Sequence, residues 1–255
     1  MGKKDKPIFK KDEMRMLAGL PLHVPSVGDI KQPKLIDIAE IGYEIYDNYL
    51  SILTFDLDDL QLDMPKEING YKITTYDICV SNCMNNEDFK KRFLSGLSFF
   101  FQETVSFYDD FGFFYVGDLE NKRYIHKDNY EYVKIVIKVV NDMEKSRQKE
   151  EKEYNPGNAK AKEIADRLKK AREQVNKIKG KSSENESISF ADLVSAFCIH
   201  GNVNIKEVWD LTIYQFNNQF QRMQVFDDYD ISIRSLLAGA DPNKVEVKHY
   251  VRKLD

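Results

Sequence analysis

Residues 208–223 have the sequence VWDLTIYQFNNQFQRM, which holds the densest apolar stripe of the chain. The apolar side chains of this stripe recur at spacings of four, three, four and three residues: Trp209, Ile213, Phe216, Phe220 and Met223. Because an α-helix completes one turn in about 3.6 residues, this spacing predicts a helix with one apolar face. This apolar face has two possible roles. Either it forms the core of a C-terminal lobe, or part of it forms a groove that binds a helix of a partner protein.

The second role, a groove for a partner helix, assigns functions to individual side chains. Apolar residues would anchor the partner helix, and polar residues beside them would form the rim of the groove. The candidate partner-binding residues are Trp209, Ile213, Phe216, Gln219, Phe220 and Arg222.

Helical spacing extends over most of the remaining chain. A helix is expected after Pro33, with Leu35, Ile38, Ile45, Tyr49 and Ile52 on one broad face that Tyr46 and Leu53 widen. The apolar spacing over residues 71–101 predicts two helical pieces, the second beginning near Asn86. Further helices are expected from Asp128, from Ser189, from Asn204, and over residues 230–240. The fold class predicted is therefore mainly α.

One stretch has the character of β-structure. Residues 107–125 are rich in Phe, Tyr and Gly, and a Gly117-Asp118 break separates Phe113–Val116 from Arg123–Ile125. Aromatic and β-branched residues, which favour strands, on either side of a glycine-containing turn predict a small β-hairpin here.

Composition changes abruptly after Asp142. Between residues 143 and 186, 22 of 44 residues are charged, with 13 Lys or Arg and 9 Asp or Glu, so little apolar area is available for packing. Inside this segment a short heptad seam runs from Ala161 to Ile178. We predict a mobile charged arm at 1–13, an N-terminal helical lobe with the hairpin at 14–142, a charged linker at 143–186, and a C-terminal helical lobe at 187–255.

Charge and cysteine usage limit the function classes. The net charge of −4 gives no general attraction for nucleic acid. Three cysteines, no signal peptide and no apolar run long enough for a membrane span favour a protein of the cytoplasm. No cofactor motif is present, and no activated nucleophile is recognisable, so we expect a protein that is not an enzyme. Cys79 with Cys83, and Cys198 with His200, leave open a zinc site and with it a metal-dependent or nucleic-acid-acting enzyme.

Two stretches resemble a known family. The first runs from Leu17-Ala18-Gly19-Leu20-Pro21-Leu22 to Tyr46, and the second runs from Val208 to Arg222. Together they resemble tail assembly chaperones, which long-tailed phages of Gram-positive hosts encode near the tape-measure gene. The resemblance implies a non-catalytic role in the host cytoplasm: binding hydrophobic helical segments of the tape-measure protein and assisting assembly of the tail tube. The protein partner would be the tape-measure or the tail tube protein, and a homo-oligomer is possible. A structural component of the virion is the alternative.

Overall fold

The structure is a computed structural model that describes residues 13–57, 67–68, 71–143, 188–239, 241–242 and 245–254. Its contacts divide the chain into two units, residues 1–142 with 204–255, and residues 143–203. The predicted C-terminal lobe of residues 187–255 therefore spans both units. The predicted linker at 143–186 lies outside the described residues except for Met143, as does the predicted arm at 1–13 except for Glu13.

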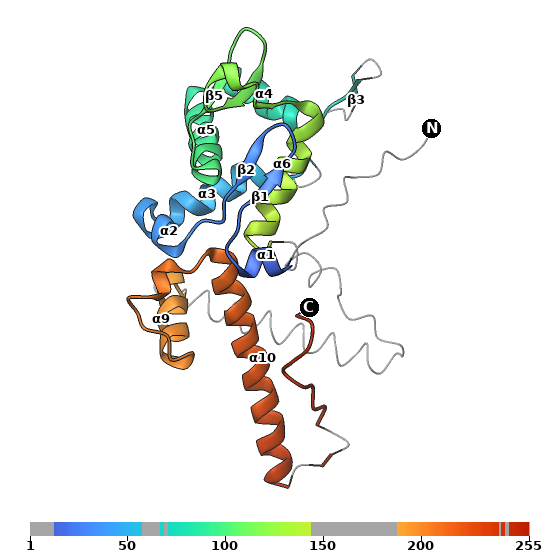
Figure 1. The fold of residues 1–255 in the computed structure, drawn as a ribbon. Coiled ribbons are helices and arrows are strands. Elements are labelled where there is room, and N and C mark those ends of the chain that lie inside the picture. Colours follow the sequence, from blue (N-terminus) through green and yellow to red (C-terminus); the bar gives the residue numbers. More distant parts are fainter. Residues whose placement is uncertain are drawn as a thin grey trace, which may run out of the picture. The chain divides into compact units, whose positions relative to one another are not determined.

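The described residues are mainly α-helical with small antiparallel sheets, which confirms the predicted fold class (Figure 1). The helices are α1 (Glu13–Leu17), α2 (Leu35–Ile41), α3 (Tyr43–Thr54), α4 (Thr75–Asn85), α5 (Glu87–Phe101), α6 (Lys127–Val140), α9 (Phe190–His200) and α10 (Ile213–Leu237), with 3-10 turns η1 (Leu119–Asn121) and η2 (Val208–Asp210). Two hairpins pair β1 (Leu22–Val24) with β2 (Gly28–Ile30) and β3 (Glu67–Ile68) with β4 (Tyr71–Lys72). The third sheet has the order β5 (Val105–Tyr108), β6 (Phe113–Val116) and β7 (Tyr124–Ile125).

Helix α5 lies at the centre of the aromatic core. Asn86 caps it by accepting a hydrogen bond from the Phe89 amide, as the predicted start near Asn86 requires. Phe93, Leu97 and Phe100 are fully buried on one face of the helix. The ring of Phe93 meets Phe114 of β6 at 5.0 Å and Tyr130 of α6 at 6.3 Å, so this one helix joins the sheet to α6.

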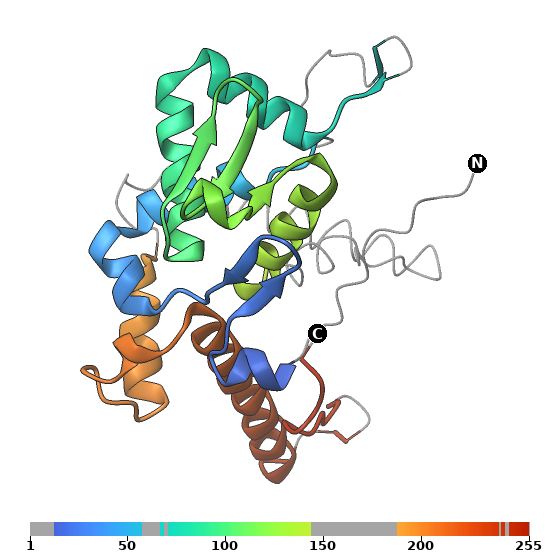
Figure 2. The same ribbon diagram turned by 45° about the horizontal axis from the view of Figure 1, so that its top comes forward.

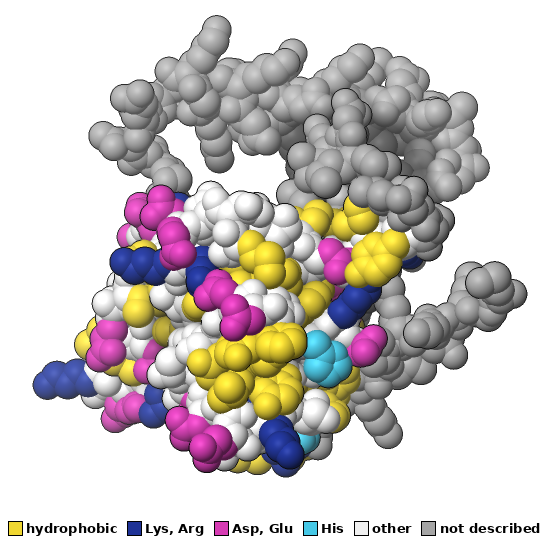
Figure 3. All heavy atoms as spheres, turned by 90° about the horizontal axis from the view of Figure 1, so that it is seen from above, with side chains coloured by type: hydrophobic (Ala, Val, Ile, Leu, Met, Phe, Trp, Pro, Cys, Tyr) yellow, Lys and Arg dark blue, Asp and Glu magenta, His cyan; other side chains and the backbone are white. Residues whose placement is uncertain are grey.

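The predicted hairpin is confirmed as β6 and β7, which pair antiparallel on either side of the Gly117-Asp118 break, and β5 adds a strand on the other edge of β6 that was not predicted. Side chains alternate between two faces, as the two-residue period of a strand requires. The inner face is buried and consists of Val105, Phe107, Phe114, Val116 and Ile125. Figure 2 shows the three strands side by side in front of α5. Figure 3 looks down on the end of the molecule where the β5–β6 turn lies, and hydrophobic side chains gather there in a patch.

The expectation of one uninterrupted helix after Pro33 is wrong. The chain breaks between α2 and α3 at Gly42, whose φ of 87° is a conformation that glycine adopts at little cost. The break changes which part of the expected face points inward after it. Tyr46 and Leu53, on the edge of that face, are buried as expected, whereas Ile45 is 48% exposed.

Another hairpin, of β1 and β2, occupies the region after Leu17, although Pro21 and Pro25 lie in or beside it. Gly28 in this hairpin lies against Arg123, because a Cβ at Gly28 would be 2.2 Å from the Nη2 atom of Arg123. The close approach lets Arg123 donate to the carbonyl oxygen of Val27 at 2.7 Å and form an ion pair with Glu103 at 2.6 Å. Arg123 therefore joins the β1–β2 hairpin to the ends of the larger sheet.

Three predicted helix boundaries are also corrected. Helix α6 is capped by His126 with Asn129, two residues before the expected pair of Asp128 and Glu131. The helix expected from Asn204 begins instead at Ile213, where Thr212 and Gln215 form a capping box. The separate helix expected over residues 230–240 is the end of the same α10. In α9, by contrast, Ser189 is the cap that the sequence predicted.

Candidate interaction surface on helix α10

The start of α10 is joined to the segment before α2 by backbone hydrogen bonds. The Leu35 amide donates to the carbonyl oxygen of Leu211 at 2.9 Å, and the Ile213 amide donates to that of Pro33 at 2.8 Å. An isolated antiparallel bridge between Lys34 and Thr212 lies between these two bonds. Residues almost 180 positions apart in the sequence thus form one small β-contact.

Buried side chains reinforce this contact. The Thr212 hydroxyl donates to Oε1 of Gln32 at 3.0 Å, and Nε2 of Gln32 donates to the Leu20 carbonyl oxygen at 2.8 Å. Both Gln32 and Thr212 are 5% exposed, so their polar groups are satisfied by each other and by the backbone rather than by water. Gln215 adds a bond to the Leu17 carbonyl oxygen at 2.8 Å. Residues 17–35 and 211–215, which belong to the two stretches that carry the family resemblance, are therefore in direct contact.

The structure separates the six candidate partner-binding residues into two groups. Ile213 and Phe216 are 4% and 2% exposed, so these two side chains are part of the buried interior. Trp209, in η2, and Phe220 are half-buried, and Gln219 and Arg222 are exposed. A partner could reach Phe220, Gln219 and Arg222 without unfolding the protein, but it could not reach Ile213 or Phe216.

From its second turn onward, α10 has no buried residue: every side chain from Asn217 to Leu237, all of them in the described part, is half-buried or exposed. Two polar contacts hold the beginning of this part to the end of α6. Asn217 donates to the Asn141 carbonyl oxygen at 3.4 Å, and Gln221 donates to Oδ2 of Asp142 at 2.9 Å. Figure 1 shows the helix continuing beyond these contacts.

The C-terminal residues lie against the middle of α10, which the sequence did not predict. Phe226 meets the ring of Tyr250 at 5.4 Å, and Tyr229 meets His249 at 5.3 Å and Tyr250 at 5.6 Å. Arg222 donates to the carbonyl oxygens of Tyr250 and Arg252. The guanidinium group that was assigned to the rim of a groove therefore also holds the C-terminal segment.

Apolar side chains remain accessible along the rest of α10. Phe226 is 49% exposed, Ile231 is 61% exposed and Leu237 is 83% exposed. These three side chains are five and six residues apart, so they do not all lie on one face of the helix. Exposed apolar side chains on a helix are nevertheless a usual contact surface for an amphipathic partner helix. The asparagine and glutamine residues of the preceding turns, between Asn217 and Gln224, can hydrogen-bond to a partner backbone without adding charge.

Part of the chain is similar to a known family. Residues 179–255 match the family model of the YomV second domain. This is a phage-associated family, and the matched residues include α9, η2 and α10. No curated protein and no solved structure matches the chain.

The cysteines considered for a zinc site lie in different surroundings. Cys79 and Cys83 share the buried face of α4, and the Cys79 thiol is 3.4 Å from the Tyr130 hydroxyl. Among the described residues, no three His, Cys, Asp or Glu side chains are grouped so as to hold a metal ion.

A membrane-spanning helix must be both long and apolar. No helix in the described part of the chain has both the length and the apolar composition for crossing a membrane.

We expect Cys79 and Cys83 to resist alkylation in the folded protein. Burial raises the pKa of each thiol from 9.0 to about 12. At about pH 8, the fraction of each thiol present as the reactive thiolate is therefore roughly a thousandfold smaller than for an exposed cysteine. The measurement is iodoacetamide labelling of a Cys198→Ala variant, followed by mass spectrometry, with and without urea. Labelling should be slow until urea is added. Rapid labelling of the folded variant would contradict the burial of these thiols.

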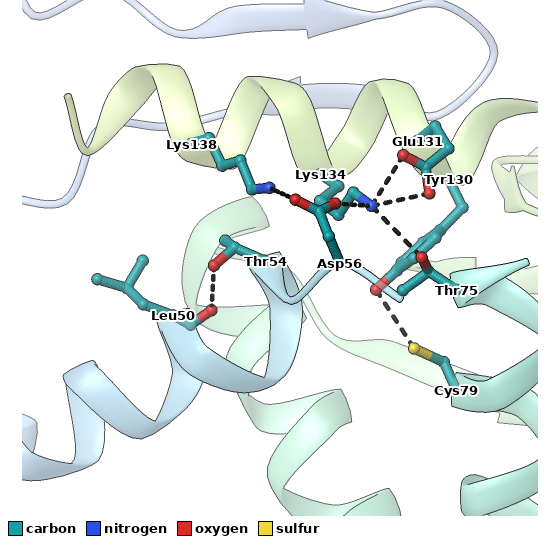
Figure 4. Close-up of polar contacts among 9 residues, drawn as sticks. All are labelled: Leu50, Thr54, Asp56, Thr75, Cys79, Tyr130, Glu131, Lys134 and Lys138. Atoms are coloured by element: carbon teal, nitrogen blue, oxygen red, sulfur yellow. Dashed lines mark hydrogen bonds and ion pairs between the residues drawn. The ribbon is translucent and has the colours of Figure 1, made fainter. Parts of the chain in front are cut away.

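A buried lysine, Lys134, lies in a cluster of four charged side chains (Figure 4). Lys134 of α6 is 3% exposed, and its ammonium group lies 2.9 Å from Asp56 and 2.8 Å from Glu131. The second carboxylate oxygen of Asp56 accepts from Lys138 at 2.9 Å. Two ammonium groups thus face two carboxylates, and the cluster joins the segment that follows α3 to α6. Its charges compensate one another, which is the arrangement of a structural ion-pair network.

Proposed function

We propose that this chain is a non-catalytic phage protein that acts as a tail assembly chaperone. In this role, residues 217–237 of α10 hold an apolar helical segment of the tape-measure protein until the tail tube assembles around it. The observation that carries the proposal is the long helix whose first turn is buried and whose remaining apolar side chains are accessible. The match of residues 179–255 to a phage-associated family and the resemblance to tail assembly chaperones agree with it.

The geometry suits a client that must later be released. A half-exposed stripe offers a partner helix less apolar area than a closed groove, so the affinity is moderate and dissociation is fast. The buried first turn of α10 fixes the direction of the stripe, because the capping box and the contact with residues 33–35 hold the start of the helix. Ordering the surface before the client arrives reduces the entropic cost of binding.

Replacing Phe220 with alanine is expected to weaken client binding and leave the fold intact. Since Phe220 is half-buried, the substitution should lower the free energy of unfolding by only about 1 kcal/mol. The amount of tape-measure protein that co-purifies from phage-infected host cells should fall several-fold. Circular dichroism melting and quantitative immunoblotting measure the two effects.

The matched control is Asn218→Ala. Asn218 lies two residues away, and therefore on almost the opposite side of the helix. The control variant should melt and co-purify as the wild type does. Equal retention of the client by Phe220→Ala and by wild type would refute the role of this stripe. Finding the chain in purified virions at a fixed copy number would favour the alternative of a structural tail component.

A further inference from the structure

The outer face of the three-stranded sheet is aromatic where a solvent-facing sheet surface is usually polar. We define the aromatic sheet face as Tyr108, Phe111, Phe113, Tyr115 and Tyr124. Four of these side chains are half-buried, and Phe111 in the β5–β6 turn is 76% exposed. Neighbouring rings touch: Phe111 stacks on Tyr108 at 5.5 Å, Tyr108 meets Phe113 at 5.4 Å, and Phe113 meets Tyr124 at 4.9 Å.

The turn that carries Phe111 is held in place from several directions. The Tyr76 hydroxyl donates to the Gly112 carbonyl oxygen at 3.1 Å, and Lys90 forms an ion pair with Asp109 at 2.8 Å. A Cβ at Gly112 would lie 3.1 Å from the end of the Met84 side chain, so α4 packs closely under the turn. Met84, at 53% exposed, extends the apolar surface beyond the aromatic rings. A surface fixed in this way loses little conformational entropy when a partner binds.

Acidic groups border the aromatic sheet face. Between residues 103 and 128, six Asp or Glu residues stand against three Lys or Arg. Two of the three cations are already engaged, Arg123 with Glu103 and Lys127 with Asp77. Within the described part of the chain, Asp110, Asp118 and Glu120 have no such cationic partner, and all three are exposed. Figure 3 shows acidic side chains on several sides of the hydrophobic patch at this end.

Aromatic rings bordered by carboxylates form a favourable surface for cations that carry apolar stems. Arginine and lysine side chains lie over aromatic rings through cation–π attraction, and their charged ends reach nearby carboxylates. The protein makes such contacts internally, since the Lys127 ammonium group lies 3.7 Å from the centre of the Tyr71 ring. Nucleic acid also stacks on aromatic rings, but its phosphates would be repelled by these carboxylates.

We infer that the aromatic sheet face binds a basic amphipathic segment of a partner protein, with arginine or lysine side chains over the rings and against Asp110, Asp118 and Glu120. Charge complementarity selects this occupant. The surface lies on β5, β6, β7 and the turn that follows β5, and shares no residue with the stripe on α10. It is therefore a second partner site, and it does not depend on the function proposed for that helix.

The test is fluorescence anisotropy of three labelled probes with the full chain. The first probe is a peptide of about 18 residues with arginine and leucine at helical spacing. The second is the same peptide with glutamate in place of arginine, and the third is oligo(dT). We expect wild type to prefer the arginine peptide by at least about tenfold, and the binding to weaken as salt is added.

Two variants address the rings and the carboxylates separately. Phe111→Ala and the double substitution Asp110→Lys with Glu120→Lys change exposed side chains, so both variants should fold. Each should bind the arginine peptide at least about fivefold more weakly. The control is Ile45→Ala, on α3, which removes a side chain that is 48% exposed and should not change binding.

Several results would overturn the inference. These are equal binding of the glutamate peptide, preference for oligo(dT), unchanged binding by both variants, or no binding of the arginine peptide at up to about 1 mM. Self-association of wild type that Phe111→Ala abolishes, measured by analytical ultracentrifugation, would instead identify a second copy of the chain as the occupant.

Discussion

Replacing Phe114 with alanine is expected to lower the free energy of unfolding by about 3–5 kcal/mol, because it empties a fully buried site among other aromatic rings. The Phe114 ring lies 4.9 Å from Phe107, 5.0 Å from Phe93 and 5.9 Å from Tyr76. These neighbours come from a strand and two helices, so the cavity cannot close by a local shift. Urea denaturation followed by circular dichroism measures the loss.

Phe113 provides the matched control for this substitution. It is adjacent in sequence and identical in chemistry, but its side chain points to the outer face of the sheet, where it is half-buried. Phe113→Ala should therefore cost no more than about 1–2 kcal/mol. Equal losses for the two variants would show that the two faces of β6 do not differ as the structure describes.

The local features of this fold could be predicted from the sequence because their causes are local. The hairpin of β6 and β7 follows from strand formers on either side of the Gly117-Asp118 break, and α5 follows from apolar residues on one helical face after an asparagine cap. The separate helix expected over residues 230–240 was wrong. The residues just before it, Phe226-Asp227-Asp228-Tyr229, contain two aspartates between aromatic residues, which is typical of a turn. In the structure these residues lie inside α10, where Phe226 and Tyr229 contact Tyr250.

The contact between residues 33–35 and 211–213 could not be predicted in the same way. Its backbone hydrogen bonds join segments that lie far apart in the chain, and neither segment has a strand pattern of its own. Gln32 and Thr212 are polar residues that a composition argument places at the surface, yet both are buried as a pair. This contact determines which part of the apolar stripe is buried and which part stays accessible. The division within the candidate site, Ile213 and Phe216 inside and Phe220 outside, was therefore not available from spacing alone.

Replacing Asp56 with alanine is expected to lower the free energy of unfolding by about 2–4 kcal/mol. The carboxylate of Asp56 lies between two ammonium groups, at 2.9 Å from Lys134 and 2.9 Å from Lys138. Lys134 is almost completely buried, so after the substitution its one remaining charged partner in the described part of the chain is the half-exposed carboxylate of Glu131. Removing one member of a buried ion pair is costly chiefly because the remaining charge stays out of water. Urea is the suitable denaturant for this measurement, because it is uncharged and does not screen the pair.

The origin of this cost can be tested by removing the other charge as well. Lys134→Met replaces the ammonium group with an apolar side chain of similar length and leaves Asp56 paired with Lys138, so by itself it should change stability by no more than about 1 kcal/mol. If the stranded charge is the cause, Lys134→Met should recover most of the stability lost in Asp56→Ala. The coupling between the two substitutions should then be about 1–3 kcal/mol. Additive losses would mean instead that Asp56 stabilises the protein through contacts other than Lys134.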